Sequence, residues 1–291
     1  MKRPNPVPSR IVPKGADAIA NSPHAGRTAS RHGLGLGAAL LVALSAASSA
    51  VAAPAKPTIV LVHGAFADAS SWNGVTRILE RDGYPVVAVA NPLRGVRSDA
   101  TYVADVLKGI SGPALLVGHS YGGSVISEAV TDRTKVKGLV YVAAFAPDAG
   151  ETAAQLSGQF PGSTLAPTLA EPVHLSAGGD DLYIQQDKFP KQFAADVPEA
   201  EAKLMAAAQR PITKEALNEP SAEGAWSIIP SWFIYGDQDK NIPPEALAFM
   251  AHRARSRETI VVKGASHVVM VSHPQDVAQL IEKAARGSQG E

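Results

Sequence analysis

Cysteine is absent from this sequence of 291 residues. Its absence excludes disulfides, thiolate metal sites and a thiol nucleophile, although it is compatible with an oxidising compartment. A net charge is also missing, because 27 Lys and Arg residues balance 27 Asp and Glu residues. Charged residues make up only 19% of the chain, below the roughly 25% that is usual for soluble domains. Hydrophobic residues make up 45%, which suffices for the core of one large α/β domain or two small ones.

The balanced charge conceals two unlike parts of the chain. Residues 1–52 hold six basic residues and one acidic residue, whereas residues 53–291 hold 21 basic and 26 acidic residues, a net charge of −5. A mildly acidic body disfavours a nucleic-acid partner. The histidines form no H-E-x-x-H or similar ligand spacing, and no G-x-G-x-x-G follows the first expected strand. We therefore expect no metal, no dinucleotide and no other cofactor.

A long hydrophobic run is missing as well. The apolar stretch over residues 34–47 has about fourteen residues, fewer than the ~20 that span a bilayer. It follows a basic, polar start and ends in Ala50-Val51-Ala52, an A-x-A pattern typical of signal-peptidase sites. The pattern predicts a cleaved export signal over residues 1–52, a bacterial periplasmic or extracellular location, and no stable membrane insertion after processing. An uncleaved anchor or a disordered tail is the alternative.

From residue 58 onward, short runs rich in β-branched residues alternate with segments of helical periodicity. This alternation predicts the α/β class, with a mainly parallel, twisted sheet and helices on both of its faces. The expected strands are 58–63, 85–90, 114–118, 137–143, 232–235 and 258–262, and the expected helices are 72–81, 102–110, 124–130, 246–252 and 277–285.

One stretch, about residues 147–230, interrupts the alternation and contains no convincing buried strand. Helical patterns cover residues 182–192, 198–209 and 213–217, separated by Pro and Gly. Because the stretch is too long for an ordinary loop, we predict a helical cap inserted over the carboxyl edge of the sheet. Ligands bind at that edge in folds of this class. The expected organisation is thus one domain over residues 53–291 with a cap insertion.

The sequence Gly118-His119-Ser120-Tyr121-Gly122 carries the chemistry. It is a G-x-S-x-G motif between an expected strand and an expected helix, which is the context that exposes a nucleophilic serine on a sharp turn. The following helix directs its N-terminal amides at any oxyanion formed there. Ser120 is therefore the predicted nucleophile.

A serine hydroxyl needs a base, and the base needs an orienting acid. In folds with this motif the chain order is Ser, Asp, His. Asp237 and Asp239 follow a late expected strand, and His267 follows the last one. Taken singly, the aspartates are ordinary turn residues and the histidine an ordinary surface residue. Together, in this order and each after a strand, they predict a Ser-His-Asp triad.

At this point the sequence resembles the α/β-hydrolase superfamily over residues 57–286. The resemblance implies that Asp239 rather than Asp237 is the acid, and that the amides of Ala65 and Tyr121 form an oxyanion hole. It also implies that Phe66 flanks the acyl pocket. His119 is expected to pack under the turn at the edge of this pocket rather than to act as a second base. The motifs that carry the resemblance are His63-Gly64, Gly118–Gly123, Gly236–Asp239 and Gly264–His267.

Differences from related families reduce the number of reactions that the sequence favours. Ser120 argues against dehalogenases and epoxide hydrolases, which resemble this chain but use an aspartate nucleophile. The layout is similar to plant methylesterases and hydroxynitrile lyases. The lyases have Lys after the catalytic His and Thr after the loop His, whereas this chain has Val268 and Gly64. The cap also carries many charged residues, unlike the apolar lids usual in lipases.

The sequence therefore predicts a secreted serine hydrolase, a carboxylesterase that acts on small to medium esters through an acyl-enzyme. The partner is a small-molecule ester, and no oligomeric state is assigned. One alternative is a ligand-binding protein on the same scaffold with negligible turnover. Another is related triad chemistry on lactones, amides or C–C bonds, or perhydrolysis.

Overall fold

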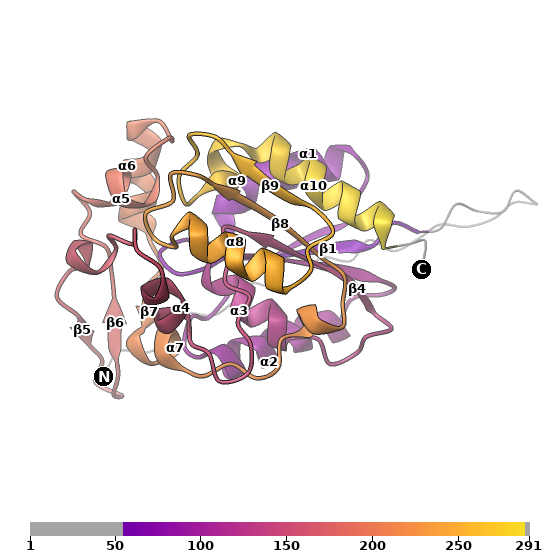
Figure 1. Cartoon of the computed structure of the whole chain (residues 1–291), viewed down its shortest axis with the longest axis horizontal. Coiled ribbons are helices and arrows are strands. Elements are labelled where there is room, and N and C mark those ends of the chain that lie inside the picture. The colour runs from indigo at the N-terminus through magenta and orange to yellow at the C-terminus, as the bar shows by residue number, and fades with distance from the viewer. Residues whose placement is uncertain (1–54, 289–291) are drawn as a thin grey trace, which may run out of the picture. The chain divides into compact units, whose positions relative to one another are not determined.

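The computed structural model describes residues 55–288, and Figure 1 shows the whole chain. The export segment predicted for residues 1–52 lies outside the described residues and stays a prediction. Within residues 55–288, no helix is long and apolar enough to cross a membrane. The main sheet has six strands in the order β2-β1-β3-β4-β8-β9, and every neighbouring pair is parallel. The predicted α/β fold with a parallel sheet is confirmed.

The central strands are buried along almost their whole length because helices cover both faces of the sheet. This environment explains their continuous apolar sequences, such as Thr58-Ile-Val-Leu-Val62 in β1. Val62 pairs with Gly118, and Gly118 pairs with Tyr141, so the carboxyl ends of the strands lie at one edge. The six strands are β1 (Thr58–Val62), β2 (Val86–Val89), β3 (Ala114–His119), β4 (Val136–Val142), β8 (Ser231–Gly236) and β9 (Thr259–Val262).

Five longer helices form the two outer layers (Figure 1). α1 (Asn73–Arg81) and α10 (Pro274–Gly287) pack against each other on one face of the sheet. α2 (Val96–Lys108), α3 (Tyr121–Glu128) and α8 (Pro244–Arg253) cover the other face, as right-handed crossovers require. Two short elements, η1 (Ala69–Trp72) and α9 (Val269–Ser272), lie beside α1. The insertion lies at the carboxyl edge of the sheet, where its residues share a cavity with Ser120 and His267.

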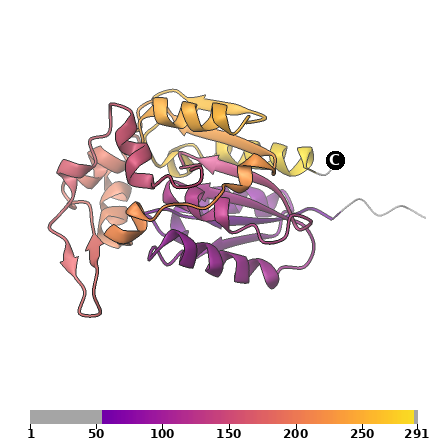
Figure 2. The ribbon, with the colours of Figure 1, turned by 60° about the horizontal axis from the view of Figure 1, so that its bottom comes forward.

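The insertion between β4 and β8 differs in part from the predicted helical cap. Residues 182–192 do not form one helix, because Leu182 ends a strand and helix starts only at Phe189, next to Pro190. A small antiparallel sheet in the order β5-β6-β7 replaces the missing helix. Figure 2 shows its β5–β6 hairpin extending away from the main sheet. The elements are α4 (Ala153–Gln159), η2 (Ala166–Thr168), β5 (Val173–His174), β6 (Asp180–Leu182), α5 (Phe189–Phe193), α6 (Glu199–Ala208), β7 (Ile212–Thr213), α7 (Lys214–Asn218) and η3 (Ala225–Ser227).

Arg94, in the loop after β2, fastens this insertion to the main sheet. Its guanidinium pairs with Asp181 at 2.6 Å and donates a hydrogen bond to the carbonyl of Pro211 at 3.0 Å. The Thr213 hydroxyl donates to the Arg94 carbonyl at 3.0 Å, and the Thr213 amide donates to the Leu93 carbonyl at 3.1 Å. The cap is therefore held at a fixed place next to the carboxyl edge of the strands.

Candidate active site

Ser120 lies at the sharp turn between β3 and α3, as the motif predicts. Its backbone has φ 52° and ψ −124°, a left-handed conformation that costs energy for a residue with a side chain. The flanking glycines make this turn possible, because a Cβ on Gly118 would lie 2.6 Å from the carbonyl oxygen of Gly122. A Cβ on Gly122 would collide with the carbonyl of Val62 in β1. The turn therefore depends on glycine at both positions, and it directs Ser120 to the carboxyl edge of the sheet.

His267 and Asp239 form a buried pair on the loops after β9 and β8. The Nδ1 atom of His267 lies 2.6 Å from Oδ2 of Asp239, and both side chains are almost fully buried. The other oxygen of Asp239, Oδ1, accepts hydrogen bonds from the amides of Asn241 at 2.8 Å and Ile242 at 3.0 Å. Because a carboxylate only accepts, Nδ1 carries the proton and Nε2 of His267 is left as a base.

Asp237 has a different role from Asp239. Its Oδ1 accepts a hydrogen bond from the Gly264 amide at 2.7 Å, and its side chain is partly exposed. Asp237 therefore braces the turn that precedes His267, while Asp239 alone contacts the imidazole. The structure thus places Asp239, and not Asp237, against His267.

Ser120 and His267 line the same cavity, which has a volume of about 370 Å³. Its wall is mainly apolar and is built from both the sheet edge and the cap. Within the part of the chain that the structure describes, no Asp, Glu, Lys or Arg side chain lines it. Phe66 contributes to the wall, as predicted. Other large apolar residues there are Phe145, Leu165, Leu169, Phe193, Leu217 and Ile242.

Ala65 and Tyr121, the expected oxyanion donors, also line this cavity. The loop after β1 lies directly on the serine turn, since a Cβ on Gly64 would lie 2.6 Å from Cβ of Ser120 and 2.9 Å from the Tyr121 nitrogen. The amide of Phe66 is used elsewhere, because it donates to the Arg210 carbonyl at 3.0 Å. Among residues 55–288, no acceptor engages the amides of Ala65 and Tyr121. Both are thus available to a ligand oxygen beside Ser120.

A family model described as the alpha/beta hydrolase family matches residues 59–280, most of the described chain. The protein belongs to this family. A similar relative is the alpha/beta hydrolase nvfD of Aspergillus novofumigatus, 28% identical over 79% of this chain and 97% of its own. Salicylic acid-binding protein 2 of Nicotiana tabacum is 27% identical over 77% of this chain and 96% of its own.

Solved structures show the same fold. The crystal structure of polyneuridine aldehyde esterase is similar with a TM-score of 0.68, covering 79% of this chain and 99% of that chain at 18% identity. At this identity the likeness shows the fold alone. The family match and the related sequences support a hydrolase.

His119 does not line the cavity of this α/β hydrolase, contrary to its expected place at the pocket edge. The ring is fully buried behind His267, with ring centroids 4.8 Å apart. Its Nε2 atom lies 3.1 Å from the carbonyl oxygen of His267 and donates to it. The ring also packs against Trp72 and Phe193, at centroid distances of 6.4 and 6.3 Å. His119 therefore packs behind His267 and holds its backbone carbonyl.

His63 is also a structural residue. Its Nδ1 donates to the Gly64 carbonyl at 3.0 Å, and its Nε2 accepts from the Asn91 amide at 3.1 Å. Burial lowers the pKa of His63 from its ordinary value of 6.5. The neutral ring fixes the loop that carries Ala65.

Acid is expected to destabilise the fold through His119. Burial, and then the nearby His267, lowers the pKa of His119 well below its ordinary value of 6.5. Below that pH the unfolded chain binds a proton that the folded chain refuses, so stability falls as the pH decreases through about 6.5. The loss is at most about 1.4 kcal/mol of unfolding free energy per pH unit for one ring. Guanidinium unfolding at several pH values measures it.

Two variants isolate this contribution. His119→Gln keeps a side-chain donor for the His267 carbonyl but cannot titrate, so the slope of stability against pH should decrease. His252→Gln, at an exposed position on α8, is the matched control and should leave the slope in place. Equal slopes in the parent and His119→Gln would show that His119 does not govern the acid response.

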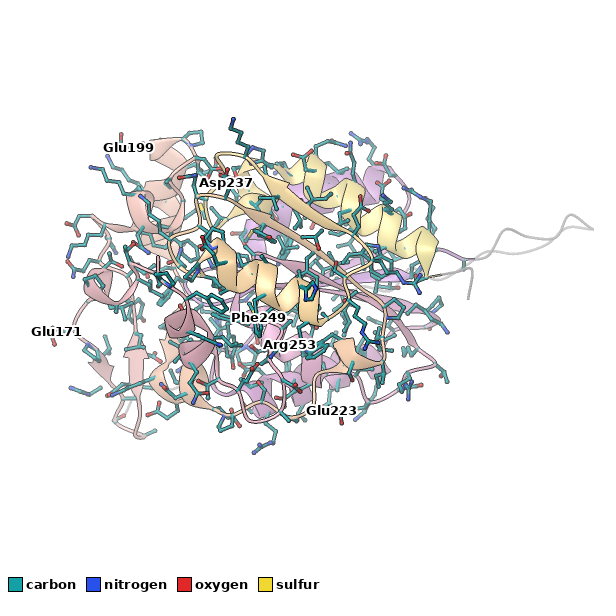
Figure 3. All side chains as sticks on the ribbon, viewed as in Figure 1. Glu171, Glu199, Glu223, Asp237, Phe249 and Arg253 are labelled. Atoms are coloured by element: carbon teal, nitrogen blue, oxygen red, sulfur yellow. The ribbon has the colours of Figure 1, made fainter. Side chains whose placement is uncertain are left out.

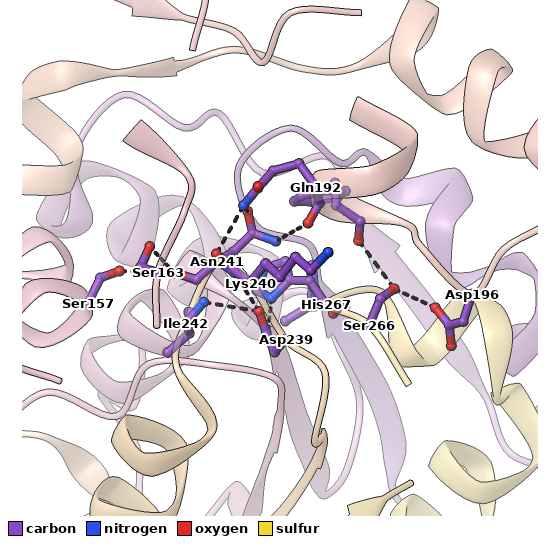
Figure 4. A network of polar contacts seen from close by, with 12 residues as sticks. Ser157, Ser163, Gln192, Asp196, Asp239, Lys240, Asn241, Ile242, Ser266 and His267 are labelled. Carbon is purple, nitrogen blue, oxygen red and sulfur yellow. Dashed lines mark hydrogen bonds and ion pairs between the residues drawn. The ribbon is translucent and has the colours of Figure 1, made fainter. Parts of the chain in front are cut away.

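Cap residues hold the loops that carry Asp239 and His267 (Figure 4). The sequence did not indicate these contacts. Gln192 donates to the Lys240 carbonyl at 2.9 Å and to Oδ1 of Asn241 at 3.2 Å, while Nδ2 of Asn241 donates back to the Gln192 carbonyl at 3.3 Å. Ser266, next to His267, donates to Asp196 of the cap. A lone glutamine or serine in an irregular segment carries no pattern that could have revealed these contacts.

Phe193, another cap residue, contacts His267 directly. Its ring lies edge-on to the His267 ring, with centroids 5.1 Å apart. The cap therefore packs against the His267 ring and forms part of the cavity wall. Within residues 55–288, no group of three or more His, Asp or Glu side chains is placed to hold a metal ion.

Proposed function

We propose that this protein is a serine carboxylesterase that hydrolyses uncharged esters of small to medium size through an acyl-enzyme. One observation carries the proposal: Ser120 and the buried His267–Asp239 pair meet at a single apolar cavity. A serine, a base and an orienting acid in this order are the groups that acyl transfer needs.

The reaction follows from the positions of these groups. Nε2 of His267 removes the Ser120 proton while Oγ attacks the ester carbonyl, and the amides of Ala65 and Tyr121 bind the resulting oxyanion. Each such donor is typically worth about 3 kcal/mol of transition-state stabilisation. His267 then gives its proton to the leaving alcohol, and the acyl group stays on Ser120. A water molecule, deprotonated by His267, attacks the acyl-enzyme and releases the carboxylic acid.

The cavity supports an uncharged substrate. Burying a charged acyl or alcohol group against an apolar wall without a partner is costly, and no Asp, Glu, Lys or Arg side chain of residues 55–288 lines the cavity. Charged cap residues such as Glu171 and Glu199 are exposed and point outward (Figure 3). The volume of about 370 Å³ is at the small end of ligand pockets.

Two residues disfavour a lyase, an activity that occurs among the relatives, which include an alpha-hydroxynitrile lyase of Arabidopsis thaliana. The position after His267 is Val268, which is fully buried and cannot supply a charge. The position after His63 is Gly64, where even a Cβ would lie 2.6 Å from the His119 carbonyl oxygen. A threonine, as in the lyases that this branch resembles, therefore does not fit this loop.

The test is the reaction of the purified protein with p-nitrophenyl acetate. We expect a burst of p-nitrophenol equal to the enzyme concentration, followed by turnover, because acylation by this activated ester is faster than hydrolysis of the acyl-enzyme, which therefore accumulates. A neutral p-nitrophenyl butyrate should be hydrolysed at least about tenfold better, as kcat/KM, than the anionic p-nitrophenyl hemisuccinate. Neither burst nor turnover with any ester would favour the alternative of a ligand-binding protein on this scaffold.

A further inference from the structure

Phe66 lies between two cavities. On one side is the cavity of Ser120 and His267, and on the other is a second cavity of about 470 Å³. The second cavity lies between the η1–α1 segment and the cap helix α6, and Met205, Val271 and Ala67 contribute apolar wall. Phe66 lines both cavities, with Ala65 on the active-site side and Ala67 on the other. The proposed reaction uses only the first cavity.

The Phe66 side chain is fixed in this place. It is only 3% exposed, and its ring contacts the edge of Phe193 at a centroid distance of 6.1 Å. Its backbone has φ 60°, a left-handed conformation rare for an aromatic residue. The hydrogen bond from its amide to Arg210 of the cap holds this conformation. A strained backbone persists only where its surroundings determine it, and such strain is concentrated at functional sites.

We propose that Phe66 is a specificity-determining residue, whose ring closes the active-site cavity toward the second cavity and so limits substrate length. The proposal rests on the esterase function proposed above. An apolar chain that passed Phe66 would reach Met205 and Val271, while the charged groups of the second cavity, such as Arg77 and Glu201, are exposed and stay in water. The second cavity could therefore accept an apolar chain, and the Phe66 ring prevents it.

Phe66→Ala tests the proposal with two series of substrates. One series is p-nitrophenyl esters from acetate to dodecanoate, and the other is acetate esters of primary alcohols of increasing length. In at least one series, the ratio of kcat/KM for the long ester to that for the short ester should rise at least about tenfold over the parent, since pocket methylenes discriminate on this scale. Phe66→Leu removes less of the ring and should raise the same ratio by about threefold.

A blocking substitution shows whether the gain uses the second cavity. Ala208 is exposed at the end of α6 and lines this cavity, whereas its neighbour Ala207 is exposed and does not. In the Phe66→Ala background, Ala208→Trp should return the chain-length profile to that of the parent. Ala207→Trp in the same background is the matched control and should retain the gain for long esters.

Turnover of p-nitrophenyl acetate distinguishes failure of the esterase function from failure of the proposed role of Phe66. A parent protein without ester turnover would overturn the esterase function and this inference together. Normal acetate turnover with an unchanged length profile in both Phe66→Ala and Phe66→Leu would overturn the inference alone. Where Phe66→Ala loses acetate turnover through misfolding, seen as a lost thermal transition, Phe66→Leu decides. If Phe66→Ala combined with Ala208→Trp still favoured long esters, the inference would also be overturned, because the long chain would then lie outside the second cavity.

Discussion

Alanine in place of Ser120 is expected to lower kcat for p-nitrophenyl acetate by a factor on the order of 10⁶, as removal of a triad nucleophile does. Among residues 55–288, the other two serines that line the cavity, Ser157 and Ser163, donate their hydroxyls to the Asn241 carbonyl, so neither replaces the attacking oxygen. The substitution adds no atoms and removes one oxygen, so the fold should be unchanged. Kinetics of the purified variant, with its circular dichroism and melting temperature, check both statements.

Ser124 provides a matched control for this experiment. It lies one turn along α3, and its buried Oγ has no hydrogen-bond partner among the described residues. Ser124→Ala should therefore keep kcat within about threefold of the parent, as is usual for substitutions that break no contact. Residual hydrolysis in Ser120→Ala comes at most from the oxyanion donors and binding. Turnover near the parent value in a purified Ser120→Ala protein would contradict the assignment of the nucleophile.

Sequence reasoning could predict the sheet and the chain positions of the candidate site for clear physical reasons. A strand buried on both faces, such as Thr58–Val62, must be apolar throughout, and that leaves an unmistakable run. The turn around Ser120 excludes side chains at Gly118 and Gly122, so it leaves a fixed glycine spacing. The parallel topology then brings the residues after β8 and β9 to the same edge.

The cap could not be predicted to the same depth. The strands β5 and β7 have two residues each, too few for any periodicity to appear. The contacts of Gln192 with the loop of Asp239 join segments far apart in sequence and use backbone carbonyls, which exist at every position. The buried place of His119 and the left-handed backbone of Phe66 likewise depend on packing partners that arrive from the cap and from the last loop.

These contacts also explain how Asp239 is held. Its Oδ1 is occupied by the two amides of Asn241 and Ile242, and Asn241 is in turn held by Gln192 of the cap. The carboxylate therefore cannot rotate, and Oδ2 stays directed at His267. This orientation makes the effect of an amide at residue 239 predictable.

Asp239→Asn is expected to lower kcat for p-nitrophenyl acetate by about 10⁴. In the variant, the side-chain oxygen must stay with the amides of Asn241 and Ile242, because an NH₂ group there would face two donors. The NH₂ group then faces His267 and donates to Nδ1, so the proton of the imidazole moves to Nε2. A base protonated at Nε2 cannot accept the Ser120 proton, although the fold and the cavity are intact.

Asp237→Asn is the matched control, since it makes the same chemical change two residues away. Asp237 only accepts from the Gly264 amide and from its neighbour Gln238, and an asparagine oxygen can do the same. We therefore expect kcat within about threefold of the parent, the range of substitutions that preserve their contacts. A large loss in Asp237→Asn with near-parent activity in Asp239→Asn would reverse the assignment of the acid. Comparable large losses in both would mean that the Gly264 turn, and not the charge on Asp239, governs the position of His267.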